Sequence, residues 1–446
     1  MPENDVALMG HLMRRAGFGA QYHELEARAA KGYEETVEEL LHPDETTHGM
    51  DLDLAERYFI EWNHHIRCVP EYIAFRMINS KSQLEEKMIL FWHGILCHTD
   101  SKNQSQVASH AEWEMLRRCG MGSFKDLLIE ISKDPAMVYF LDNCLSHKDA
   151  INENYGRELL ELFSLGVGMD GEFNYTEDDV KECARAFTGW TIANGMPPQP
   201  YGRYTSTFVY NPDDHDDGEK TFLGHTGNFN GEDIIDILCN QPATARFISR
   251  HIYDFFVADE AQVPTWMDTP PRDPETIKML EDEYFRSDYN IRSMLRVLFN
   301  SDAFKNARFA RIKGPIETVI GTLRLAGDWT TPKPGFESIF EEMKHMGQEI
   351  LNPPSVEGWH TGRDWIDYAS SLYFQITDED RAVWASNDPA HWTEESFSIV
   401  VSSAYNVGDG QIGQQYYNRH IRTIERRIKQ AGVRLADQLD SLLGDG

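Results

Sequence analysis

The feature that most constrains this chain is a long series of short amphipathic helix patterns, each closed by glycine or proline. The first three patterns cover residues 7–16, 22–30 and 34–41, and they stop at Gly17, Gly32 and Pro43. Glycine just beyond the last turn and proline shortly after it are ordinary signals for the end of a helix. The chain is therefore predicted to fold mainly from α-helices.

The same spacing of apolar residues continues along the chain. Ser82 and Glu85 have the spacing of a capping box, which predicts a helix beginning there. Thr176 is predicted to cap another helix, over 177–188. Further helices are expected over residues 116–133, 152–165, 232–239, 242–257, 274–285, 291–299, 315–326 and 336–346.

Two long stretches lack the helix pattern. Residues 190–231 are rich in Gly, Pro, Asp and aromatic residues, with a strand candidate at 204–210 and at most a short β-hairpin near 204–224; residues 347–367 are also irregular. Residues 414–443 have heptad spacing and predict a C-terminal helical arm. We expect one large mainly α body over residues 1–370, with an irregular insert at 190–231, followed by a divergent segment over 371–446.

The net charge and the cysteine spacing of the chain argue against several classes of function. The 446 residues include 42 Lys and Arg against 73 Asp and Glu, a formal net charge of −31. This charge argues against nucleic acids and anionic membranes as partners, because both require cationic surfaces. The cysteines form no Cys-x-x-Cys pair, and we find neither a signal peptide nor a membrane-spanning run. We therefore expect a cytoplasmic protein whose substrate, if it has one, is a small molecule that is neutral, cationic or delivered with a metal.

A set of motifs occurs in order over roughly residues 8–370. The motifs are HLMRRAGFG at 11–19, FWHG at 91–94, DPAM at 134–137, LDN at 141–143, NENYGRELLELFSLG at 152–166, AFTGW at 186–190, HDDGEKTFLG at 215–224, KGPIE at 313–317 and PPSVEGW at 353–359. This ordered set resembles the bacterial family known as domain of unknown function 1800. The resemblance implies no activity, because that of the family is unknown. Many relatives look exported, whereas this chain lacks an export signal. Relatives commonly have Asn-His-Phe after the tryptophan, whereas here His98 is the next histidine after His93.

His93 and His98 are the first candidate metal ligands. On a continuous helix five residues rotate the side chain by about 140°, so the two imidazoles would point apart. They could share one ion only if the helix ended near Gly94. The alternative is that one histidine caps the helix end and the other packs in the core.

The segment 152–166 carries a polar arc opposite its apolar face. Glu158 and Glu161 are candidate metal ligands together with Asp142, because buried carboxylates must be paired or bound to metal. Asn152, Glu153 and Asn154 are candidate substrate-binding residues. The alternative is a solvated stripe of ion pairs, and the Glu-x-x-His signature of two-metal carboxylate sites is missing.

The acidic loop at 211–220 is the best loop candidate. We expect His215 backed by Asp216 to act as a general base, with Lys220 stabilising negative charge and Arg157 orienting carboxylates or substrate. The alternative is an acidic turn held by side-chain-to-backbone bonds. Trp190 and Trp359 could stack on a sugar or another flat ligand, although core packing would also account for them.

The leading hypothesis is a metal-assisted enzyme, hydrolytic or oxidative, that uses a divalent cation of unknown identity and acts on a small or carbohydrate-like substrate. The competing hypothesis is a non-catalytic scaffold or partner-binding protein, in which the C-terminal helix mediates assembly into a homo-oligomer. A haem-type pocket using His93 is a third possibility, without an attachment motif. The sequence contains no serine-hydrolase elbow, P-loop or dinucleotide fingerprint.

Overall fold

A computed structural model describes most of the chain up to residue 359. The described residues are 3–43, 49–61, 68–196, 206–327, 329–332, 336, 339–340, 343–344 and 347–359. The predicted C-terminal helix at 414–443 and the segment 371–446 lie outside these residues, and the predicted helix at 336–346 lies only partly within them.

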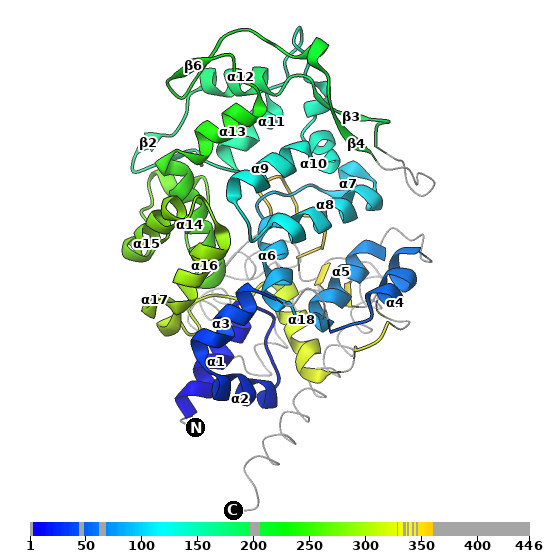
Figure 1. Cartoon of the computed structure of the whole chain (residues 1–446), viewed down its shortest axis with the longest axis vertical. Helices are drawn as coiled ribbons and strands as arrows, with labels where there is room; N and C mark the ends of the chain where they lie inside the picture. Colours follow the sequence, from blue (N-terminus) through cyan, green and yellow to red (C-terminus); the bar gives the residue numbers. More distant parts are fainter. Residues whose placement is uncertain are drawn as a thin grey trace, which may run out of the picture.

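The fold is mainly α, as predicted (Figure 1). The helices of the first half are α1 (Glu3–Arg15), α2 (Tyr22–Lys31), α3 (Tyr33–Leu41), α4 (Leu52–Glu56), the π-helix η1 (Arg57–Glu61), α5 (Cys68–Asn79), α6 (Gln83–His93), α7 (Asp100–Asn103), α8 (Gln106–Cys119), α9 (Phe124–Lys133), α10 (Pro135–Phe140) and the 3₁₀ helix η2 (Asn143–Leu145). The second half adds α11 (Asn154–Glu161), α12 (Glu177–Ala186), η3 (Pro212–Asp214), α13 (Gly231–Cys239), α14 (Pro242–Phe256), η4 (Thr265–Met267), α15 (Pro274–Arg286), α16 (Ile291–Asn300), α17 (Asp302–Asn306) and α18 (Pro315–Ala326).

The described strands form three antiparallel two-stranded ribbons. They are β1 (Gly168–Met169) with β2 (Glu172–Phe173), β3 (Trp190–Ala193) with β4 (Thr207–Tyr210), and β5 (Lys220–Phe222) with β6 (His225–Gly227). The predicted strand at 204–210 therefore exists as β4, paired with Trp190 opposite Tyr210. The irregular insert carries two ribbons rather than one hairpin.

Helix α6 is the central element of the body (Figure 1). All of its residues except Glu85 are buried, and it packs against α3, α5 and α8. Such a helix needs a partner for every polar side chain that it carries, because no face meets water. Glu86, Lys87 and His93 are all fully buried. Glu86 pairs with Arg76 and Arg117, so Lys87 and His93 are the residues on α6 whose partners remain to be described.

Two local predictions need correction. The segment 116–133 is not one helix, since α8 ends at Cys119 and α9 begins at Phe124. Gly120 lies between them, where the indole nitrogen of Trp92 donates to its carbonyl at 2.6 Å and leaves no room for a side chain. Ser82 does precede α6, but its side chain makes no capping bond. The predicted cap at Thr176 is confirmed and forms a capping box with Asp179.

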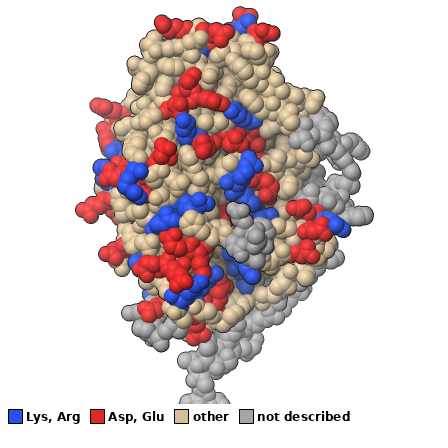
Figure 2. Space-filling model, in the orientation of Figure 1, with Lys and Arg blue, Asp and Glu red and all other residues tan. Residues whose placement is uncertain are grey.

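The surface of the face seen in Figure 2 carries acidic and basic side chains in mixed groups, with broad acidic areas. No helix among the described residues has the length and apolar character that a membrane span requires.

Candidate metal centre

Two histidines and a glutamate meet in the core where α6 ends against α8. His93, His98 and Glu112 each offer a ligand atom, and these atoms all lie within 4.8 Å of one another. All three side chains are fully buried. In the part of the chain that the structure describes, this is the group of His, Cys, Asp or Glu side chains close enough to hold one ion.

The end of helix α6 is what brings the two histidines together. His93 is its last residue, and the backbone N–H of the following Gly94 bonds to carbonyls of the last turn. The chain then turns through residues 94–96 before His98, and the two imidazole centroids lie 5.4 Å apart. The condition derived from the sequence, a helix ending near Gly94, is therefore met.

His98 is held at both ring nitrogens by helix α8. Its Nδ1 lies 2.7 Å from Oε1 of Glu112, and its Nε2 lies 2.9 Å from Oγ of Ser109. The Ser109 hydroxyl also lies 3.4 Å from a carboxylate oxygen of Asp100, whose other oxygen accepts from Gln106 at 2.7 Å. A chain of polar contacts thus leads from His98 away from the cluster.

His93, in contrast, forms no hydrogen bond through its ring with any residue that the structure describes. Its Nδ1 lies 3.7 Å from Oε1 of Glu112, which is too long for one. Within the described residues, both of its ring nitrogens are buried without a hydrogen-bond partner, and Oε2 of Glu112 has none apart from the carboxyl of Asp134. Because each unpartnered buried polar atom costs about 1–3 kcal/mol, a group that paired with the His93 nitrogens would stabilise the cluster.

The protonation states suit metal ligands. Burial lowers the pKa of His93, so its imidazole is neutral and keeps a free lone pair. Burial opposes ionisation of Glu112, but the neighbouring His98 and His93 outweigh it and lower the pKa of Glu112 to about 2. Burial and then the Glu112 charge raise the pKa of Asp134 well above its usual value. The cluster therefore holds one carboxylate and a neutral imidazole, the forms that bind cations.

A distant segment, residues 349–359, closes the cluster. The Trp359 ring lies 5.2 Å from the His93 ring, on which Trp113 also packs at 5.2 Å. The Cys97 thiol donates to the carbonyls of Ser355 and Val356 at 3.5 and 3.3 Å. The PPSVEGW motif thus lies over the histidines of the FWHG region.

The predicted loop residues are engaged elsewhere. Asp216 accepts from Arg185 of α12 at 2.7 and 3.1 Å, and Nδ1 of His215 donates to the Thr188 carbonyl at 2.9 Å. The buried ammonium of Lys220 donates to the carbonyls of Asp216 and Gly218 at 2.5 and 3.1 Å. These contacts hold the loop 211–220 against α12 and the residues that follow it.

The predicted polar arc of α11 also forms local pairs. Arg157 donates to Glu177 at 2.8 and 2.7 Å and lies 3.8 Å from Glu153, while Glu161 accepts from the Tyr175 hydroxyl at 2.9 Å. Asn154 donates through its side chain to the Leu141 carbonyl at 3.2 Å and through its backbone to the side chain of Asn152 at 3.0 Å. Asp142 lies 3.0 Å from the ammonium of Lys102.

Glu158 differs from the rest of this arc. Its side chain is half-buried and forms no ion pair within the described residues. Burial, and then the charge of Glu161, raise its pKa to about 7. Both Glu158 and Glu112 act on the Cys97 thiol, whose pKa burial raises to about 12. Glu158 is therefore close enough to Cys97 and Glu357 for its charge to interact with theirs.

The helix α11 and the His215 loop attach to opposite ends of α12. Arg157 reaches Glu177 at its first residue, and Asp216 reaches Arg185 near its last. Eight residues of helix span about 12 Å. The structure therefore does not join these two predicted halves into one site. Trp190 packs between Phe187 and Phe208, in the β3–β4 region, whereas Trp359 belongs to the cluster.

Sequence reasoning missed Glu112 and Ser109. On α8, the buried side is formed by residues spaced three and four apart, and Ser109, Glu112 and Leu116 occupy it. A carboxylate at an apolar position of an amphipathic helix is the signal that could have identified Glu112, because a buried charge needs a partner.

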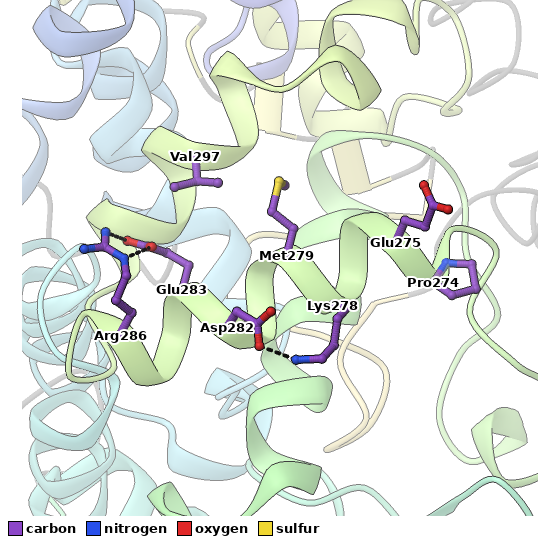
Figure 3. A pocket seen from close by; sticks show the side chains of 8 residues that line it. All are labelled: Pro274, Glu275, Lys278, Met279, Asp282, Glu283, Arg286 and Val297. Atoms are coloured by element: carbon purple, nitrogen blue, oxygen red, sulfur yellow. Dashed lines mark hydrogen bonds and ion pairs between the residues drawn. The ribbon is translucent and has the colours of Figure 1, made fainter.

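A surface depression over α15 and α16 offers no comparable chemistry (Figure 3). Its charged side chains pair with one another on α15, Lys278 with Asp282 and Arg286 with Glu283. Its apolar lining is mainly Met279 and Val297. Paired surface charges of this kind are ordinary helix contacts.

One known protein family matches most of this chain. The family model described as "Protein of unknown function (DUF1800)" matches residues 11–423. The chain belongs to this family. The DUF1800 match runs beyond residue 370, the end of the motifs recognised in the sequence, and so includes much of the segment called divergent above. No curated protein and no solved structure matches the chain.

Proposed function

We propose that this protein is a metal-dependent enzyme whose ion is held by His93, His98 and Glu112. The observation that carries the proposal is the buried meeting of two imidazoles and a carboxylate, with both ring nitrogens of His93 lacking a hydrogen-bond partner among the described residues. Two histidines and one carboxylate form the ligand set of zinc hydrolases and of non-haem iron oxygenases. The proposal therefore covers hydrolytic and oxidative chemistry.

Each residue has a role in this proposal. Glu112 supplies the negative charge and His93 a free lone pair. His98 binds through Nδ1 and donates its other N–H to Ser109, which in turn donates to Asp100. A second hydrogen bond that fixes the tautomer and orientation of the ring is the usual partner of a metal-bound histidine.

A bound cation of this kind supplies Lewis acidity and activates a water molecule or another small ligand. Because the protein supplies three ligands, a further coordination position stays open for this water molecule or small ligand. Glu158, with its pKa near 7, is our candidate for moving a proton. Trp359 beside His93 suits a small or carbohydrate-like substrate.

The test is metal analysis of the full chain purified without chelators, paired with cobalt substitution and absorption spectroscopy. We expect about one ion per chain. Glu112→Gln and His93→Asn should lose it, whereas His251→Asn, which alters another buried histidine outside the cluster, should keep it. Absence of metal in the wild type, with no uptake of Co²⁺, Zn²⁺ or Fe²⁺, would reject the proposal and leave the scaffold hypothesis.

One observation favours a second candidate, acyl transfer. Glu112, His98 and Ser109 lie in the order carboxylate, Nδ1, Nε2 and hydroxyl, at 2.7 and 2.9 Å, which is the arrangement of a catalytic triad. This function leaves the unpartnered His93 without a role, and Ser109 is fully buried. Labelling of Ser109 by a fluorophosphonate probe supports the triad, whereas a stoichiometric ion that is lost in Glu112→Gln and His93→Asn supports the metal centre.

A further inference from the structure

Three cationic side chains that form no ion pair within the described residues lie at or near the end of α1. Arg14 lies in the last turn of that helix, and Arg308 and Lys313 lie between α17 and α18. Within the described residues none of them forms an ion pair or a hydrogen bond through its side chain. In a chain with 73 acidic residues against 42 basic ones, such unpaired cations are unexpected.

An exposed aromatic ring joins the cations. Phe309 is 73% exposed, and the guanidiniums of Arg14 and Arg308 lie 5.7 and 5.6 Å from the centroid of its ring. Its backbone has φ +61°, a left-handed conformation that is an outlier for a bulky side chain. Backbone strain of this kind concentrates at ligand sites, where it is part of the binding geometry.

The carboxylates beneath this patch do not neutralise it. Glu317 is already contacted by Arg15 at 3.6 Å, Arg311 at 2.6 Å and Lys87, and it also accepts from the Gly314 amide. Asp254 accepts from the Glu260 amide at 2.8 Å, and Asp259 accepts from the Ile312 amide at 3.3 and 3.2 Å, so the oxygens of both carboxylates already have partners.

The cations also repel one another. Burial lowers the pKa of Arg14, and the charge of Arg308 lowers it further. Burial likewise lowers the pKa of Lys313, with Arg14 and Arg15 adding to the effect although Glu317 opposes it. A bound anion would relieve this repulsion.

We propose that Arg14, Arg308, Phe309 and Lys313 form a binding site for the phosphate group of a small anionic molecule. Guanidinium groups match phosphate oxygens in pairs, and an ammonium adds a point charge. The net charge of −31 repels an extended polyanion, so the ligand class is a small phosphorylated compound rather than a nucleic acid. This site is independent of the metal centre.

The experiment is calorimetric titration of the full chain with inorganic phosphate, pyrophosphate and phenyl phosphate, at low and at physiological ionic strength. We expect pyrophosphate to bind, more weakly in salt, and its Kd to rise about tenfold or more in the double variant Arg308→Gln, Lys313→Gln. Phe309→Ala should weaken the binding of phenyl phosphate and leave the binding of inorganic phosphate unchanged. Arg118→Gln, which alters an exposed arginine paired with Glu130 at 3.0 Å, should bind like the wild type.

Three outcomes would overturn the proposal. The first is no binding of pyrophosphate at millimolar concentration to wild-type protein whose circular dichroism is that of a folded chain. The second is an equal loss of affinity in Arg118→Gln and the double variant. The third is tighter binding of a short DNA duplex than of pyrophosphate, which would make the patch a nucleic-acid surface instead.

Discussion

The Nδ1 atom of His98 lies 2.7 Å from Oε1 of Glu112, and helix α8 holds the other side of the same ring through Ser109 at 2.9 Å. Ser109 and Glu112 are one helical turn apart, so a single rigid element fixes the imidazole at both nitrogens. The ring cannot turn without breaking a buried contact. This fixed orientation is what a ligand in a metal centre requires.

Ser109→Ala tests this second contact. The variant keeps Glu112 and both histidines but releases Nε2 of His98, so we expect metal affinity to fall about 10–100-fold with the fold retained. Competition with a chromogenic chelator measures it. Ser132→Ala is the matched control, because it removes another fully buried helical serine hydroxyl, which contacts the Leu128 carbonyl and the Tyr155 hydroxyl. Equal affinities in the two variants would contradict the role of Ser109.

The sequence predicted the helical architecture well, because helix-period spacing and stop signals are local. Helix α18 has the predicted bounds, and α13 to α16 differ from prediction by one residue at an end. The break between α8 and α9 could not be predicted, since it depends on Trp92, far along the chain, contacting Gly120. For the same reason, only the two histidines of the metal-centre cluster were predicted from the sequence. His93 and His98 are neighbours in sequence, but Glu112 joins them through the packing of α8.

Glu317→Gln tests the buried ion cluster. Removing the one carboxylate that Arg15, Lys87 and Arg311 share leaves these three buried cations without their common ion-pair partner. We expect the free energy of unfolding to fall by about 3–5 kcal/mol. Urea denaturation measures it. Glu130→Gln, at an exposed pair with Arg118, should change stability by less than about 1 kcal/mol.

Asp254 gives stability a pH dependence of definite sign. Burial raises its pKa to about 6 in the folded state, against about 3.9 when unfolded. Between these values the folded state holds the proton that the unfolded state has released, so stability falls as pH rises from about 4 to about 6. Two pKa units correspond to at most about 3 kcal/mol.

Asp254→Asn should remove this loss, since Asn keeps an acceptor for the Glu260 amide. The difference in unfolding free energy between variant and wild type should therefore grow in favour of the variant by about 1–3 kcal/mol between acidic and neutral pH. Asp178→Asn, at a side chain that is 89% exposed, serves as control. A difference that stays constant with pH would show that Asp254 ionises normally.

Gly358→Ala tests the closure of the cluster by residues 349–359. Gly358 has φ +88°, and an added Cβ would overlap the Gly94 carbonyl at the end of α6. We expect destabilisation of about 1–3 kcal/mol, together with a shifted tryptophan emission as Trp359 leaves His93. Gly224→Ala isolates the overlap, because Gly224 has φ +80° but open space around it. The closure is absent if both variants behave alike.

Helix α6 carries Lys87 in its middle and His93 at its last residue, six positions and about 9 Å further along its axis. The buried ion pairs around Glu317 and the cluster of His93, His98 and Glu112 are therefore connected by one buried helix. Because α6 is buried along its length, exposing either cluster requires displacing the helices packed against it. An ion held at the C-terminal end of α6 would therefore exchange very slowly in the native protein. Its release would require either global unfolding or displacement of the segment 349–359.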